Sequence, residues 1–152
     1  MHGKLLAKNK QVFAEYEILD TFEAGMKLTG PEVKSVKSGQ IKLLGSFASL
    51  NPSNGLLRLT GAHISPYKPA AGAQMNYDPT RPRVLLMNKK EITSLIGKLK
   101  EKRLSLVPLS IYSKSGIIKV ELGLVRGKKQ YEKREQLKKR DIERDIGRRL
   151  KS

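Results

Sequence analysis

The sequence predicts a mainly β fold, in which short strands form a small barrel with two or three packed helices and a basic tail follows. Three observations predict it. Short apolar segments bounded by glycine, proline and asparagine recur along the first 125 residues, as in strands joined by turns. Two other segments have helical spacing and helix boundary signals. At Arg126 the composition changes, and basic residues begin to dominate.

The first half of the chain predicts three strands and one helix. Residues 14–28 alternate apolar and polar side chains in part, which favours a strand. Residues 32–37 fit a short helix that begins near Pro31 and stops at Gly39. Strands are expected at 46–50 and 56–59, joined by a turn that contains Asn-Gly.

The second half predicts a long loop, a helix and three strands. Residues 66–82 contain several prolines, and long loops in compact domains are usually functional or mobile. Asn88 can cap a helix whose apolar residues face the core, rather than a partner groove. Further strands are expected at three places, with a turn at 113–116: 104–107, 109–112 and 117–124.

These elements favour an oligonucleotide-binding (OB) barrel, a common fold for a basic protein of this size. The fold by itself does not settle the function. We therefore expect an OB-like RNA-binding body at residues 1–125 and a basic tail at residues 126–152.

The charge of the chain predicts a polyanionic partner. Lys and Arg total 31 against 14 Asp and Glu, for a net charge of +17. Such an imbalance is compensated by RNA, DNA or an acidic membrane. No apolar run approaches the roughly 18 residues of a membrane span, and the apolar start of the chain is too short for a signal peptide. The chain has no cysteine, so a reducing cytoplasm is the expected compartment.

The tail differs from the body in its chemistry. From Arg126 to Ser152 it has twelve basic and five acidic residues, a charge of +7, and too thin an apolar stripe to bury. We expect it to be disordered when free and helical once phosphates neutralise it. The alternatives are a solvated tail that only aids solubility and, less favoured, a helix on a membrane surface.

A search for catalytic chemistry finds none, which predicts that the protein is not an enzyme. The loop from Gly123 to Lys129 lacks the spacing and the Ser or Thr of a phosphate loop. No His, Asp or Glu cluster has metal-ligand spacing, so no metal or cofactor is expected. Candidate RNA contacts are cations for phosphates and rings for stacking: Lys34, Lys37, Arg81, Arg83, His63, Tyr67 and Tyr131.

Four ordered segments resemble one known family. They are Glu-Ala-Gly-Met-Lys-Leu-Thr-Gly-Pro-Glu-Val-Lys-Ser at 23–35, His-Ile-Ser-Pro-Tyr at 63–67, Asp-Pro-Thr-Arg-Pro-Arg at 78–83 and Gly-Lys-Lys at 127–129. Together they resemble small protein B, the SsrA-binding proteins of bacterial trans-translation. The resemblance extends from Asn9 to the tail.

The resemblance implies an OB-type barrel that binds transfer-messenger RNA (tmRNA) at the elbow of its tRNA-like domain. It also implies delivery of alanyl-tmRNA, with elongation factor Tu and GTP, to stalled ribosomes. The tail is then expected to order on the ribosome, in the empty message channel and the decoding centre. A cytoplasmic monomer without membrane contact is the expected state.

Residues matching the family's motifs supply the expected sites. Asn9, Glu23 and Leu86 match tmRNA-binding positions. In the tail, the expected ribosome contacts are Lys128, Lys129, Tyr131, Lys133, Arg134, Lys138, Lys139 and Arg140. The chain departs from the family pattern at four positions, of which only the last loses a positive charge: Glu132, Lys37, Lys42 and Leu44.

Glu23 has two interpretations, because a carboxylate repels phosphate. It is useful in an RNA binder where it accepts from a base amino group or holds a neighbouring Arg, and it is otherwise a surface ion pair.

Two other functions of the protein remain open from the sequence. One is a ribosomal or general RNA-binding protein without tmRNA specificity, and the other is an RNA-processing enzyme, which lacks a recognisable catalytic set.

Overall fold

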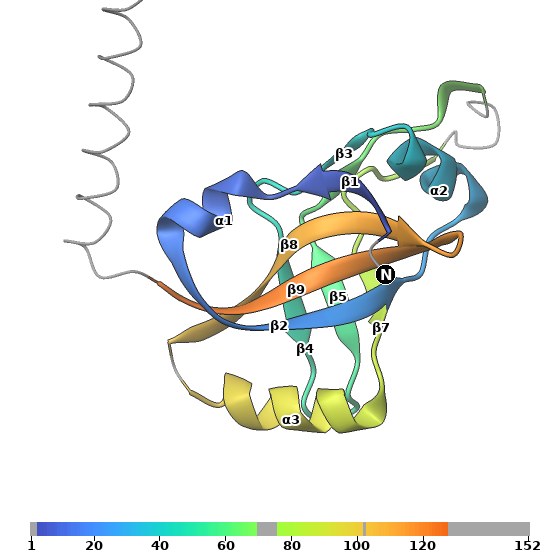
Figure 1. The fold of residues 1–152 in the computed structure, drawn as a ribbon. Helices are drawn as coiled ribbons and strands as arrows, with labels where there is room; N and C mark the ends of the chain where they lie inside the picture. Colours follow the sequence, from blue (N-terminus) through green and yellow to red (C-terminus); the bar gives the residue numbers. More distant parts are fainter. Residues whose placement is uncertain (1–2, 70–75, 102, 128–152) are drawn as a thin grey trace, which may run out of the picture.

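The structure is a computed structural model that describes residues 3–69, 76–101 and 103–127. Figure 1 shows a barrel of strands with α3 across one end and α1 and α2 near the other. The predicted mainly β class is confirmed. The helices are α1 (Lys10–Glu15), α2 (Gly30–Lys37) and α3 (Lys89–Leu99). The strands are β1 (Lys4–Lys8), β2 (Tyr16–Met26), β3 (Ile41–Lys42), β4 (Phe47–Leu50), β5 (Leu57–Thr60), β6 (His63–Ile64), β7 (Arg83–Leu86), β8 (Leu104–Lys114) and β9 (Ile117–Gly127).

The main sheet closes on itself. Its strand order is β1-β8-β4-β5-β7-β2-β9, and β9 pairs again with β8, so the strands from β8 round to β9 form an antiparallel ring. Strand β1 extends the sheet by pairing with β8. The weakest seam lies between β4 and β8, which share the single register pair Ala48 and Leu106.

The inward side chains of the strands fill the barrel, and α3 covers one end. Leu59, Ile111 and Leu122 are fully or almost fully buried, as is Leu95 of α3. The predicted cap of α3 is confirmed, since the Asn88 side chain accepts from the Glu91 backbone N–H at 2.9 Å. The apolar stripe of α3 therefore faces the core, as its spacing predicts.

Helix α2 is also confirmed, and it begins two residues earlier than expected. Thr29 is its N-cap, in a capping box with Glu32. The chain leaves the helix through Gly39, whose φ of 79° is in the left-handed region that favours glycine. This entry and exit place the basic side chains of α2 on the surface.

Two predicted hairpin turns are confirmed. Between β4 and β5, the Asn51 N–H donates to the Leu56 carbonyl at 2.9 Å, and Gly55 has a φ of 70°. Between β8 and β9, Ser115 and Gly116 both have positive φ, as a type I′ turn requires.

The predicted break between strands at 104–107 and 109–112 is wrong, because β8 continues through Pro108. The register shifts between Pro108 and Ser110, so the proline occupies a bulge. Asn9 pairs with this bulge: its Nδ2 donates to the Pro108 carbonyl at 3.0 Å, and its backbone N–H donates to Leu109 at 2.8 Å.

Other elements were not expected from the sequence: β1, α1, β3, β6 and β7. Strand β7 lacks an apolar alternation because Arg83 points inward, and residues 14–15, expected in a strand, belong to α1. Strand β9 runs to Gly127, past the change in composition at Arg126. The predictions for the tail from Lys128 onward lie outside the described residues.

Candidate nucleic-acid interface

A polar cluster lies on the outer face of the sheet, around Glu23 of β2. Ala24 and Met26 are buried, so by strand alternation Glu23 and Gly25 face outward. The Tyr112 hydroxyl donates to the Glu23 carboxylate. The Nζ atoms of Lys114 and Lys119 each lie 3.9 Å from a Glu23 oxygen.

The electrostatics of this cluster keep Glu23 charged and Tyr112 protonated. The hydrogen bond from Tyr112 and the two ammonium groups lower the pKa of Glu23, against a weaker effect of burial. Burial, together with the Glu23 charge, raises the pKa of Tyr112. The side chain of Glu23 remains 43% exposed, so its carboxylate can accept from a group outside the protein.

Leu86 joins the same face. It ends β7, pairs with Gly25 and is 58% exposed. A groove of about 470 Å³ includes Glu23 and is lined by Gly3, Leu5, Glu23, Ser110, Tyr112, Lys114 and Glu121. The fold thus brings together Glu23 and Leu86, which are far apart in the sequence. We call the outward set the Glu23 face: Glu23, Gly25, Leu86, Tyr112, Lys114 and Lys119.

A second basic surface lies along α2. Lys34 Nζ is 5.6 Å from the centre of the Tyr67 ring, within the range of a cation–π contact. Lys37 follows one turn later and is exposed. His63 of β6 pairs with Lys42 of β3, and within the described part of the chain its buried Nδ1 has no hydrogen-bond partner. We call this set the α2 edge: Lys34, Lys37, Lys42, His63 and Tyr67.

Glu32, in the first turn of α2, anchors a buried polar network. Its Oε2 accepts from Arg83 Nη2 at 2.8 Å, from Arg83 Nε and Arg81 Nε at 3.1 Å each, and from the Tyr77 hydroxyl at 3.0 Å. Its Oε1 accepts from the Thr29 N–H at 3.0 Å and from Arg81. Glu32 and Arg83 are essentially inaccessible to solvent.

This network stays ionised over the physiological range. Burial would raise the pKa of Glu32, but the hydrogen bonds from Arg81, Thr29 and Arg83 outweigh it and lower the pKa to about 2. Burial and the Glu32 charge raise the pKa of Tyr77 to about 12, although Arg83 opposes them. Because its partners come from a loop and from β7, Glu32 ties the end of the long loop to α2.

The predicted contact residues therefore have different surroundings. Glu23, Leu86, Lys34 and Lys37 are on the surface, and Arg81 is about one-third exposed. Asn9 and Arg83 are buried, and protein groups take their hydrogen bonds. In this conformation these two side chains can influence RNA binding only indirectly, by positioning the protein groups to which they are hydrogen-bonded.

Sequence reasoning missed Tyr112, Lys114 and Lys119 on the Glu23 face, and it missed Glu32 in the network. Pairing across the sheet brings the first three to Glu23, and the sequence alone does not reveal that register. For Glu32 a signal existed: a capping box after Thr29 marks a carboxylate at the third helical position.

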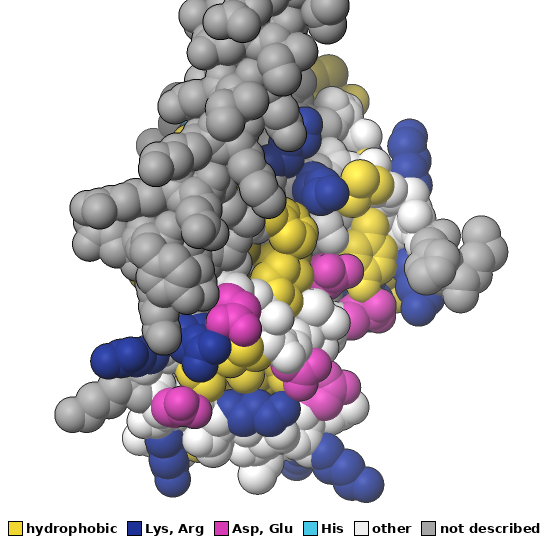
Figure 2. Space-filling model, turned by 60° about the vertical axis from the view of Figure 1, so that its left-hand side comes forward, with side chains coloured by type: hydrophobic (Ala, Val, Ile, Leu, Met, Phe, Trp, Pro, Cys, Tyr) yellow, Lys and Arg dark blue, Asp and Glu magenta, His cyan; other side chains and the backbone are white. Residues whose placement is uncertain are grey.

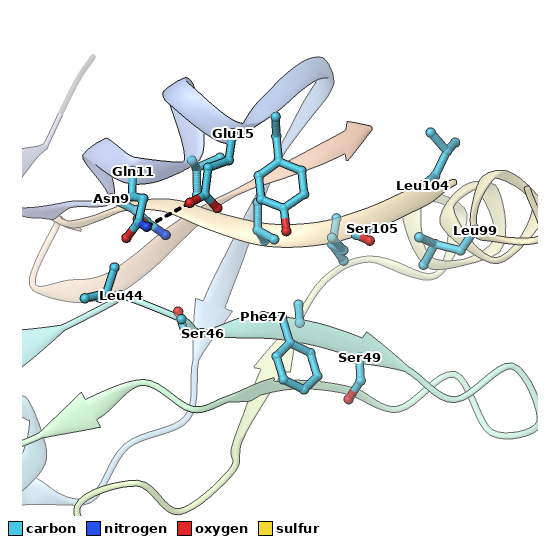
Figure 3. Close-up of a pocket in the computed structure, with 16 residues that line it drawn as sticks. Asn9, Gln11, Glu15, Leu44, Ser46, Phe47, Ser49, Leu99, Leu104 and Ser105 are labelled. Atoms are coloured by element: carbon cyan, nitrogen blue, oxygen red, sulfur yellow. Dashed lines mark hydrogen bonds between the residues drawn. The ribbon is translucent and has the colours of Figure 1, made fainter. Parts of the chain in front are cut away.

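A larger groove, of about 790 Å³, lies between α1 and the weak β4–β8 seam. Figure 3 shows Asn9, Gln11 and Glu15 on one side of it and Leu44, Ser46 and Phe47 on the other. Gln11 donates to Glu15 at 2.8 Å. Glu15 is the one charged residue in its lining, so this groove is not built to hold phosphate.

The face drawn in Figure 2 mixes basic, acidic and apolar side chains. Among residues 3–69, 76–101 and 103–127 there is no group of three or more His, Cys, Asp or Glu that could hold a metal ion. Within these same ranges, no helix is long and apolar enough to cross a membrane. The described surface thus offers cations, rings and several exposed carboxylates, among them Glu17, Asp20 and Glu23.

These features define a basic β-barrel of the RNA-binding class. The chain belongs to the SmpB family, because the family model described as SmpB protein matches residues 6–152. An SsrA-binding protein of Carboxydothermus hydrogenoformans is 48% identical over 149 residues, which cover 98% of this chain and 97% of the relative. One of Geobacter sulfurreducens is 49% identical over 151 residues, covering 99% and 96%.

A solved structure gives the same answer for the fold. It is described as "tmRNA-SmpB: a journey to the center of the bacterial ribosome". Its similar chain has 46% identity to this one and a TM-score of 0.66, and the match covers 82% of this chain and 85% of that chain. The expected barrel of this family is therefore confirmed.

Proposed function

We propose that this protein binds the tRNA-like domain of tmRNA and delivers alanyl-tmRNA, with elongation factor Tu and GTP, to stalled ribosomes. In this proposal the body captures tmRNA, and the tail from Lys128 onward occupies the empty message channel and the decoding centre. The protein acts as a monomer in the cytoplasm and performs no chemistry of its own.

The observation that carries the proposal is the similarity to SsrA-binding proteins over almost the whole chain. The surface chemistry agrees with it. The Glu23 face offers a charged acceptor, two ammonium groups and an exposed Leu86, the mixture needed to contact a base, a phosphate and an apolar ring face. The α2 edge offers phosphate binders and a ring.

Competition binding tests this function. The purified protein should bind labelled tmRNA, and excess bulk tRNA should displace that tmRNA far less well than unlabelled tmRNA does. Equal displacement by the two RNAs would instead favour a general structured-RNA binder. The salt concentration must be held constant, because phosphate contacts make affinity depend on it.

The Glu23→Ala variant should bind tmRNA more weakly than the wild type, although the protein becomes more positive. The reason is that the Glu23 carboxylate, oriented by Tyr112, accepts a hydrogen bond from the RNA. If Glu23 were only a surface ion pair, its removal would release Lys114 and Lys119 and tighten binding. Equilibrium titration with labelled tmRNA measures the sign, and tighter binding would contradict the role.

Lys34→Ala is the comparator for that measurement. If Lys34 meets a phosphate, its loss should weaken binding and reduce the salt dependence by about one contact, roughly 0.7 in the slope of log K against log salt for single strands. Loss of Glu23 should not reduce that slope, because it removes no cation. The two variants therefore separate recognition from charge attraction.

A further inference from the structure

Gly25 occupies a position where glycine weakens the fold. It lies inside β2, hydrogen-bonded into the sheet between Leu86 of β7 and Lys119 of β9. Glycine in a strand interior loses conformational entropy and contributes no packing, so it usually marks a bulge or a close approach. The register of β2 is regular here, since its one shift lies between Ile18 and Asp20.

Neither packing nor backbone conformation requires this glycine. A β-carbon at Gly25 would lie 3.7 Å from Leu86 Cβ and 4.0 Å from Lys119 Nζ, which are ordinary contact distances. Its φ is not among the positive values that favour glycine. Gly123 of β9 is the opposite case, because a β-carbon there would come within 2.9 Å of Leu109.

The side chains around the backbone of Gly25 are a carboxylate, a cation and an apolar group. Glu23, two residues earlier on the same outward face, has 43% of its side chain exposed. The Lys119 ammonium lies beside both residues, and the exposed side chain of Leu86 borders the other side. Gly25 is thus a position without a side chain, bordered by the carboxylate of Glu23, which pairs across the sheet with Glu121, and by a cation and an apolar side chain.

We propose that an exposed nucleotide of the bound RNA lies directly against the backbone of Gly25. This rests on the proposed tmRNA binding and adds a specificity-determining position to it. Glu23 accepts from a base amino group or a ribose 2′-hydroxyl, Leu86 packs against the base or ribose, and Lys119 pairs with phosphate. Glycine is present because any side chain would hold the nucleotide away from these groups.

The test is a graded pair of substitutions, Gly25→Ala and Gly25→Val, with Gly97→Ala as the matched control. Gly97 is in α3, and a β-carbon there meets nothing within 4 Å. Each variant is measured for tmRNA affinity and for thermal unfolding. We expect Gly25→Ala to weaken binding by roughly tenfold, the effect of one misplaced methyl group in a close contact, and Gly25→Val to weaken it more. The Gly97→Ala variant should bind like the wild type.

Unfolding temperature separates this role from a structural one. Gly25→Ala should unfold no lower than the wild type, because it adds strand propensity without a clash. Unchanged affinity in Gly25→Ala would overturn the proposal, and so would a lowered unfolding temperature, which would make the glycine structural. Failure of the wild type to prefer tmRNA over tRNA would instead contradict the proposed function itself.

Discussion

Deleting residues 131–152 is expected to abolish tagging of nascent chains on stalled ribosomes while leaving tmRNA affinity within about twofold of the wild type. The ring of strands closes without the deleted segment, since β9 completes its pairing with β2 and β8 by Gly127. Both surfaces proposed to bind RNA, the Glu23 face and the α2 edge, also lie in the retained part. The deletion removes most of the basic residues of the tail, together with Tyr131.

Two measurements check this expectation. A reconstituted tagging reaction on ribosomes stalled without a stop codon reports ribosome function, and titration with labelled tmRNA reports capture. A full-length variant with residues 131–152 in scrambled order keeps the length and charge, so it shows whether charge alone suffices. Tagging by the truncated protein would mean that the tail serves only solubility.

Much of the fold was predictable because local signals agreed with the tertiary structure. The capped, apolar-striped α3 and the two glycine-containing hairpin turns have short-range causes, and all three were confirmed. Strand β7 has no such signal. One of its two inward residues is Arg83, which needs Glu32 from a distant helix to be stable inside the barrel.

The candidate interface was predictable only in part. Lys34 and Lys37 were predicted as phosphate contacts on one short helix, and the structure places both on the surface of α2. Arg81 and Arg83 look equivalent in the sequence, yet one is partly exposed and the other is buried. Arg83 is the first residue of β7 and its side chain is buried, whereas Arg81 lies before the strand, in the loop. The proline-rich sequence does not reveal where the strand begins.

The network at Glu32 gives a structural reason for the family motifs, because residues of different motif segments form it. The motif segment at 23–35 supplies the carboxylate, and the segment at 78–83 supplies both guanidinium groups. Ser35 adds a second link, because its hydroxyl donates to the carbonyl of Ser65, which lies within the motif segment at 63–67. Three of the four segments that identify the family therefore meet around α2 and hold it against the barrel.

Glu32→Gln should lower the free energy of unfolding by about 3–5 kcal/mol, the usual cost of removing one partner of a buried ion pair. The change keeps the shape of the side chain but leaves Arg83 buried without a counter-charge. Domains of this size are stable by only about 5–15 kcal/mol, so the loss is a large fraction. Urea unfolding at neutral pH measures it.

Glu23→Gln is the matched control, because it also removes a carboxylate that contacts two cations. Glu23 and its two lysine partners are all at least one-quarter exposed, so its loss should cost less than about 1 kcal/mol. A similar small loss in Glu32→Gln would show that the buried network contributes little to stability. A large loss confined to Glu32→Gln would support its role as the anchor of α2.

The pH dependence of the unfolding free energy also tests whether the buried charge of Glu32 stabilises the fold. The folded pKa of Glu32 is about 2, below its ordinary value of 4.5, so its charge stabilises the fold above the unfolded pKa. That contribution is lost as the pH falls from about 5 through about 2, and below this range the carboxylate is protonated in both states. The difference in unfolding free energy between wild type and Glu32→Gln should therefore be largest near neutral pH and shrink across this window. A difference that stayed constant from pH 7 to pH 2 would mean that shape or hydrogen bonding, rather than the buried charge of Glu32, holds α2 in place.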